Sequence, residues 1–205
     1  MATSLPVPYK SQWDEDAGQG RKDCGPACIA MLLRAYRMPA STNEVFVATG
    51  AGQDEYITLP QMIQAAQQFG LTLEYHDGRG LEDLRGWLDE RRPFIALVNY
   101  DVWSSRGLTQ DDFSGSHFVV VVGYDEGNVF VNDPDYQLDR RLEGDHKSYT
   151  TQLFDQAWHD LLVHDNPNGA VLVPDRAMPV QPRDPRRGRP RPRPWGAFWR
   201  RIWRG

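Results

Sequence analysis

The sequence contains few cysteines and no long apolar segment. Only two of its 205 residues are cysteine, and Cys24 and Cys28 stand too close together to build a disulfide framework, so we expect free thiols. No apolar run approaches the roughly 18 residues that cross a bilayer, and the stretch MATSLPVPYKSQ has neither of the two regions of a signal peptide. These absences predict a cytoplasmic protein.

Signatures of bound nucleotides and metals are also weak or missing. The stretch GAGQDEY lacks the glycine spacing of a phosphate-binding loop. Cys24 and Cys28 could join a histidine at a zinc ion, but no second Cys/His pair completes that pattern. We therefore expect neither a cofactor nor a metal.

Basic charge is scarce outside the C-terminal segment. Residues 183–205 hold nine arginines and one aspartate, although the whole chain has a formal net charge of −5. The acidic remainder argues against nucleic acid as a partner. This asymmetry predicts two regions, a globular domain over 1–177 and an Arg/Pro-rich linker with a short Trp/Arg tail over 178–205.

The composition and periodicity of the first region predict an α+β domain. The chain is 40% hydrophobic and 11% aromatic, which is typical of one globular domain. Helical spacing comes first: capping boxes are expected at Ser41/Glu44 and Thr58/Gln61, and the expected helices are 24–36, from 41, from 58, 81–92 and 149–162. Strands dominate later, with β-branched runs at 71–76, 93–100, 117–125, 128–135 and 170–174. Helices followed by strands favour α+β over alternating β-α-β units.

Cys24 stands where a charged loop meets a helix, in the stretch GRKDCGPACIAML. The unpaired N–H groups and the dipole at a helix N-terminus favour a thiolate, which is the nucleophilic form of cysteine. Cys28 lies one turn further along the helix and has the position of a core residue. Cys24 is therefore the candidate nucleophile.

A cysteine nucleophile needs a base, and His117 is the best placed of the five histidines. It opens the valine-rich strand HFVVVVGYD, which would hold the ring rigidly. The DEGN turn predicts a hairpin that returns Asn132 or Asp133 to a place beside His117, where a side-chain oxygen could orient the imidazole.

Charge that develops on a substrate carbonyl oxygen needs hydrogen-bond donors. The backbone N–H of Cys24 is one candidate. A side-chain amide upstream could supply the second, and Gln12 in VPYKSQ is our choice, with Gln19 as the alternative.

Four stretches together, VPYKSQ, DCGPACIAML, GSHFVVVVGYD and VNDPD, resemble the papain-like cysteine peptidases of family 39. These are the bacteriocin-processing type and its free-standing bacterial relatives. The resemblance implies a papain-like fold with a helical half and an antiparallel sheet half. It also implies roles for four residues: Cys24 as nucleophile, His117 as base, Asp133 as its orienting partner and Gln12 in the oxyanion hole. The spacer WDEDAGQGRKD is longer than in transporter-attached members, so Gln19 stays an alternative.

The sequence thus predicts a peptidase that acts on a peptide or protein substrate. Two alternatives remain: an acyl transferase that uses the same acyl-enzyme, and a catalytically silent domain that binds through its cleft or tail.

The tail carries a separate prediction. Aromatic and aliphatic residues follow helical spacing there, at Trp195, Phe198, Trp199, Ile202 and Trp203. Arginines occupy the other positions, a pattern typical of helices at a lipid headgroup boundary. We expect the tail to bind either a membrane surface, which would make the protein peripheral, or a protein partner.

Overall fold

The computed structural model describes residues 2–18, 22–52, 55–110 and 113–180. Its elements in chain order are β1 (Thr3–Ser4), α1 (Cys24–Ala35), α2 (Thr42–Thr49), α3 (Leu59–Gln68), β2 (Leu73–His76), α4 (Leu81–Asp89), β3 (Phe94–Asn99), α5 (Asp101–Ser104), β4 (Ser116–Tyr124), β5 (Asn128–Asn132), the 3-10 turn η2 (Leu138–Gly144), β6 (Lys147–Thr150), α6 (Thr151–His159), η3 (Leu162–His164) and β7 (Val171–Pro174). The predicted α+β class is confirmed.

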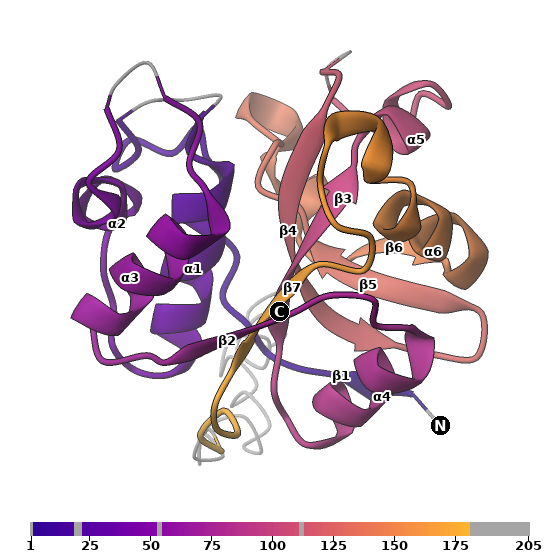
Figure 1. Cartoon of the computed structure of the whole chain (residues 1–205), viewed down its shortest axis with the longest axis horizontal. Coiled ribbons are helices and arrows are strands. Elements are labelled where there is room, and N and C mark those ends of the chain that lie inside the picture. The colour runs from indigo at the N-terminus through magenta and orange to yellow at the C-terminus, as the bar shows by residue number, and fades with distance from the viewer. Residues whose placement is uncertain (1, 19–21, 53–54, 111–112, 181–205) are drawn as a thin grey trace, which may run out of the picture.

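The molecule divides into a helical half and a sheet half. Helices α1, α2 and α3 gather on one side of the sheet, whereas α5 and α6 lie on the other side (Figure 1). The two expected capping boxes are present, at Ser41 with Glu44 and at Thr58 with Gln61. Each box satisfies two backbone N–H groups that a helix start leaves unpaired, and thereby determines where α2 and α3 begin.

The sheet is antiparallel in every described pairing, in the order β2-β7-β3-β4-β5-β6. Strand β1 pairs with the end of β4, where Thr3 faces Tyr124 and Ser4 faces Gly123, beyond the last partner of β3 at Val121. The order places β4 between β3 and β5 at the centre of the sheet, and His117 is the second residue of β4. Both neighbours can therefore contribute side chains around that histidine.

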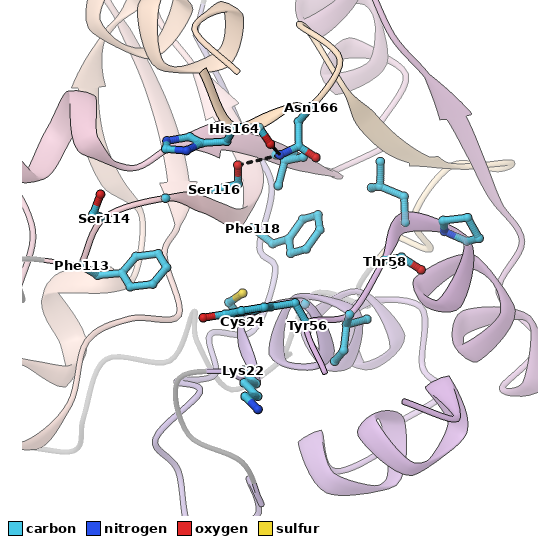
Figure 2. A pocket seen from close by; sticks show the side chains of 16 residues that line it. Lys22, Cys24, Tyr56, Thr58, Phe113, Ser114, Ser116, Phe118, His164 and Asn166 are labelled. Atoms are coloured by element: carbon cyan, nitrogen blue, oxygen red, sulfur yellow. Dashed lines mark hydrogen bonds between the residues drawn. The ribbon is translucent and has the colours of Figure 1, made fainter. Parts of the chain in front are cut away.

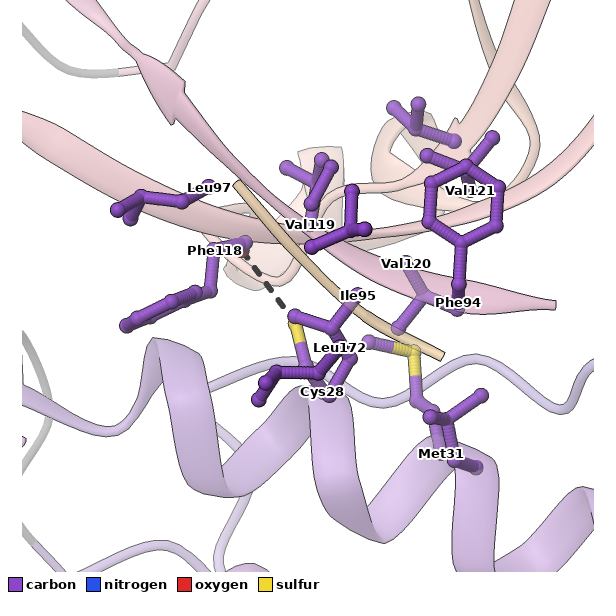
Figure 3. Packing of buried hydrophobic residues seen from close by; sticks show 14 of the residues in the cluster. Cys28, Met31, Phe94, Ile95, Leu97, Phe118, Val119, Val120, Val121 and Leu172 are labelled. Carbon is purple, nitrogen blue, oxygen red and sulfur yellow. Dashed lines mark hydrogen bonds between the residues drawn. The ribbon is translucent and has the colours of Figure 1, made fainter. Parts of the chain in front are cut away.

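The core lies between α1 and the sheet. Figure 3 shows Cys28 and Met31 of α1 facing Ile95, Phe118 and Leu172 of three neighbouring strands. Every residue from Gly25 to Ala35 except Arg34 is buried. This helix is apolar on nearly every side because α2 and the sheet both pack against it. Its N-terminus is consequently held in one place relative to β4.

The structure corrects several expected boundaries, and the helices expected over 81–92 and 149–162 end at Asp89 and His159. Tyr149 and Thr150, expected at the start of a helix, belong to strand β6; Thr150 caps α6 instead, and its side chain accepts a hydrogen bond from the Leu153 N–H. The strand expected over 128–135 ends at Asn132, because Pro134 has no N–H to continue the ladder. Short elements β1, α5, η2, β6 and η3 were not expected at all.

Contacts with the domain continue to Val180. Met178 is buried and its N–H donates to the Arg91 carbonyl, while Arg37 donates to the Val180 carbonyl. The division between residues 177 and 178 stays a prediction. The helix predicted in the tail lies within residues 181–205, outside the described part of the chain. Its expected binding to a membrane surface or a protein partner stays a prediction. Among the residues that are described, no helix has both the length and the hydropathy that a bilayer crossing requires.

Gly123 offers a test of this fold, because a side chain there would collide with β1. A Cβ at this position would lie 2.5 Å from the Thr3 carbonyl oxygen and 3.0 Å from Ser4 Cα. We expect Gly123→Ala to lower the free energy of unfolding by about 1–3 kcal/mol, as overpacked positions do. Urea denaturation measures this change. Gly127→Ala is the matched control, because nothing lies within 4 Å of its Cβ; an equal loss in both variants would contradict the prediction.

Candidate active site

The two cysteines occupy different environments although one helical turn separates them. Cys24 is the first residue of α1 and is half-buried, lining a pocket between the two halves of the molecule. Cys28 is fully buried and its Sγ lies 3.3 Å from the Phe118 carbonyl oxygen, to which it donates. Burial raises the pKa of the Cys28 thiol well above its usual value. Only Cys24 is thus placed to meet a ligand.

His117 is buried and bonded to Asp133. Its Nε2 lies 2.9 Å from Asp133 Oδ1. The sheet register explains the contact: Val120 faces Asn132, so the next residue, Asp133, comes opposite Val119, two positions from His117 on the same face. Such diagonal neighbours lie within reach of long side chains. Of the two expected orienting residues, the structure brings Asp133 to the ring, whereas Asn132 bonds the Val7 carbonyl and the His146 N–H.

The surroundings of His117 favour its protonated form. Burial by itself would lower the pKa of the imidazole, but the charge of Asp133, its hydrogen bond and a further hydrogen bond with the Cys24 thiol outweigh burial. Together they raise the pKa of His117 well above its ordinary value of 6.5. Because Nε2 is engaged by Asp133, Nδ1 is the ring nitrogen that remains for the thiol. Folding therefore gains stability from the imidazolium below about pH 6.5 and loses it as pH rises through the raised pKa.

Tyr100 is a third member of this group. Its Oη donates to Asp133 Oδ2 at 3.1 Å, and its ring packs against His117 with the ring centroids 4.4 Å apart. Burial and the negative charge of Asp133 raise the pKa of Tyr100, so the phenol stays a neutral donor. In the β3–β4 register Val98 faces His117, which makes Tyr100 its diagonal neighbour from the other side.

Gln12 lies beside the segment that carries Asp133. Its backbone N–H donates to the Pro134 carbonyl at 2.9 Å, and its Nε2 donates to Asp135 Oδ1 at 3.3 Å. Trp13 Nε1 donates to the same carboxylate oxygen. Gln12 Oε1 is buried and has no hydrogen-bond partner among the described residues, and such orphaned atoms in a native fold call for an explanation. Gln19, the alternative, lies outside the described residues.

The segment before Gln12 is fastened to the same loop. Tyr9 Oη donates to the Asp133 carbonyl at 2.9 Å, and Ser11 Oγ donates to the Tyr136 carbonyl at 2.6 Å. Gly144 packs under this junction, where a Cβ would lie 2.3 Å from the Asp133 carbonyl oxygen. Only glycine leaves room for that approach. Gln12 and Asp133, far apart in sequence, are therefore held by one network of hydrogen bonds.

A pocket of about 630 Å³ opens beside Cys24. Figure 2 shows Cys24 and Tyr56 at one side of it, His164 and Asn166 at the other, and Phe118 between them. Asn166 Nδ2 donates to Ser116 Oγ on the residue before His117. Within the described residues, histidine, cysteine, aspartate and glutamate side chains do not gather in a group of three or more that could hold a metal ion.

Sequence reasoning singled out Cys24, His117 and Asp133, which the structure brings into contact, and missed Tyr100 and Asp135. A signal for Tyr100 existed, because the end of an antiparallel strand lies beside the start of the next, and Tyr100 directly follows β3. Asp135 stands two residues after Asp133 in the same DPD stretch, and its backbone N–H donates to Asp133 Oδ1 at 3.1 Å.

The sequence was compared with models of known protein families. The model of the Peptidase_C39 like family matches residues 4–161, which is most of the chain. This chain belongs to the Peptidase C39-like family. No curated protein matches the chain closely enough to count as a relative.

Solved structures show the C39-like fold of this chain. A putative C39-like peptidase from Bacillus anthracis superposes with a TM-score of 0.62 and 15% identity, over 87% of this chain and 100% of that chain. A double glycine motif protease from an AMS/PCAT transporter, in complex with a leader peptide, gives a TM-score of 0.56 and 20% identity over 84% and 94% of the two chains. The peptidase domain of Streptococcus ComA, a bifunctional ABC transporter, gives 0.55 and 17% over 82% and 98%.

Membership in the C39-like family agrees with the papain-like architecture that the motifs implied, and it supports cysteine peptidase activity. Those motifs, DCGPAC and GSHF, both lie within the residues that the family model matches.

Tyr100 yields a prediction about this C39-like site. Tyr100→Phe keeps the ring and removes the donor to the buried Asp133 carboxylate, so we expect the free energy of unfolding to fall by about 1.5–3 kcal/mol, the range for hydrogen bonds to charged groups. Tyr136→Phe is the matched control, because it removes a bond of similar length to the neutral Leu108 carbonyl. Its expected loss is about 0.5–1.5 kcal/mol. Urea denaturation compares the two, and a smaller loss in Tyr100→Phe would contradict the assignment.

Proposed function

We propose that this protein is a cysteine peptidase in which Cys24 attacks a peptide carbonyl, His117 transfers protons, Asp133 orients His117 and Gln12 stabilises the oxyanion. The observation that carries the proposal is the chain of contacts from Cys24 through His117 to Asp133. A nucleophile, a base and an orienting carboxylate in this sequence are the components of acyl transfer by covalent catalysis.

The first half of the reaction uses the proton that His117 holds. In the active form the thiol proton resides on the imidazole, and the Asp133 carboxylate stabilises the resulting cation. The Cys24 thiolate attacks the carbonyl carbon, a C–S bond forms, and the carbonyl oxygen becomes an oxyanion. His117 then donates its proton to the amide nitrogen, the C–N bond breaks, and an amine leaves. Cys24 is left as a thioester.

The second half regenerates the enzyme with water. His117, now neutral, accepts a proton from a water molecule while that water attacks the thioester carbonyl. The C–S bond breaks and a carboxylic acid is released. The proton returned to His117 restores the starting pair, because the departing sulfur leaves as a thiolate.

Gln12 supports the oxyanion assignment by the donor that its amide still has available. One N–H of its amide is engaged by Asp135, and the amide nitrogen carries a second N–H. We assign this second donor, together with the Cys24 backbone N–H, to the developing oxyanion. At the first position of α1 the Cys24 N–H has no partner within the helix. Donors held in advance contribute to rate because they need no reorganisation during the reaction.

A peptide is the substrate class that the relatives favour. One neighbour of the same fold is a protease in complex with a leader peptide. The pocket beside Cys24 is open to receive such a chain.

The decisive test removes the proposed nucleophile. Cys24→Ala should abolish cleavage of a proteome-derived peptide mixture, as judged by mass spectrometry of new termini, because no thioester can form. Cys28→Ala is the matched control and should retain cleavage, since Cys28 is buried one turn away. Product acids rather than amides in the presence of added amines would separate a hydrolase from a transferase. Wild-type cleavage by Cys24→Ala would refute the proposal.

Gln12 and Gln19 give a second, paired prediction. Gln12→Ala should lower kcat/KM by about 10²–10³-fold, the loss typical of one oxyanion donor. It should also lower the free energy of unfolding by about 1.5–3 kcal/mol, because it removes the hydrogen bond to the buried Asp135 carboxylate. Gln19→Ala should retain wild-type kcat/KM. Steady-state kinetics on one cleaved peptide measures both, and the reverse pattern would assign the oxyanion donor to Gln19.

A further inference from the structure

The walls of the pocket beside Cys24 are mainly apolar. Carbon-rich side chains from both halves of the molecule line it, namely Tyr56, Ile57, Leu59, Pro60, Leu97, Phe113 and Phe118. Phe118 projects between the two sides of the cavity in Figure 2. The polar groups that share the lining, among them Lys22, His164 and Asn166, lie toward its margins in the same view.

The polar side chains at the margins already have partners. His164 Nε2 lies 3.1 Å from Asp101 Oδ2 and 3.2 Å from Asn99 Oδ1. The Lys22 ammonium stands over the Tyr56 ring, 5.9 Å from its centroid. A ligand inside the pocket therefore contacts mainly the carbon atoms of these side chains.

The size of the pocket also limits what fills it. A volume of about 630 Å³ falls within the roughly 300–1,000 Å³ of ligand sites. One neighbour of the same fold is a double glycine motif protease. Glycine has no side chain to occupy such a cavity, and apolar walls left in water contribute nothing to binding.

We infer that this pocket binds one bulky apolar side chain, of leucine or phenylalanine size, from a substrate residue within two positions of the scissile bond. The inference rests on the proposed function, because Cys24 lines the pocket and marks where the scissile bond must lie. An extended chain advances about 3.3 Å per residue, so a side chain in this cavity belongs to a residue close to that bond. The apolar lining of the pocket thus narrows the substrate class from any peptide to peptides with a bulky apolar side chain near the scissile bond.

Peptide chloromethyl ketones test the inference without requiring turnover. In these reagents a thiolate displaces chloride and forms a C–S bond. Two series, acetyl-X-chloromethyl ketone and acetyl-X-Gly-chloromethyl ketone, carry X as Gly, Asp, Leu or Phe. We expect Leu and Phe to modify Cys24 at least tenfold faster than Gly and Asp in one of the series, because burying a large apolar side chain is worth that factor or more. Intact mass and peptide mapping give the rates.

Filling the pocket should remove the preference. Leu59 is the first residue of α3, half-buried on the pocket wall and outside the proposed catalytic group. Leu59→Trp should reduce the advantage of Phe over Gly below threefold, with the rate for each reagent divided by that variant's own rate with iodoacetamide. Leu142→Trp is the control, since Leu142 is exposed on η2 and does not line the pocket.

The outcomes separate this inference from the proposed function. Equal rates for all X, or a fastest rate with Gly or Asp, would overturn the inference and leave the peptidase proposal standing. An iodoacetamide rate at Cys24 that is the same in the wild type and in His117→Ala would overturn the proposed function, and with it the assignment of this pocket to a substrate.

Discussion

The buried hydrogen bond between His117 and Asp133 is the contact on which the candidate site depends. Burial disfavours an imidazolium and a carboxylate alike, and a buried pair is tolerated only when its remaining polar atoms also have partners. Here Tyr100 donates to one oxygen of Asp133 and the Asp135 N–H to the other. The pair is thus satisfied on all sides, and the charge and hydrogen bond of Asp133 keep the pKa of His117 raised despite burial.

The antiparallel register supplies these partners from both sides. Tyr100 follows β3, His117 is the second residue of β4 and Asp133 follows β5, so one end of three adjacent strands gathers the group. The loop after β5 then reaches the N-terminal segment through Tyr9, Ser11 and Gln12. The site is consequently built where the sheet ends, on residues that lie within a strand or directly follow one.

The thiol comes from the other half of the molecule. Helix α1 is buried along most of its length between α2 and the sheet, which holds its N-terminus against β4. The same division creates the pocket, because its walls come from the start of α3 on one side and from β3 and β4 on the other. Position of the nucleophile and shape of the substrate cavity therefore depend on one packing interface.

Local pattern determined much of this protein before any contact was known. The capping boxes of α2 and α3, the helix that begins at Cys24 and the valine-rich strand after His117 all follow from residue spacing, because caps and periodicity act within a few residues. The DEGN turn, which sets which strands pair, also limited the orienting residue to Asn132 or Asp133. The family resemblance added Gln12, which no local pattern selects.

Only the tertiary structure decided the contacts that join distant segments. The anchor of Gln12 on Asp135 and the apolar pocket both require segments that are distant in the chain to meet. Residue spacing within one segment carries no information about which other segment it contacts. Short elements such as β6 were missed for the same reason: their four residues follow no period long enough to detect, and they are strands because β5 lies beside them. Spacing along the chain specified which residues could react, and packing specified that they meet.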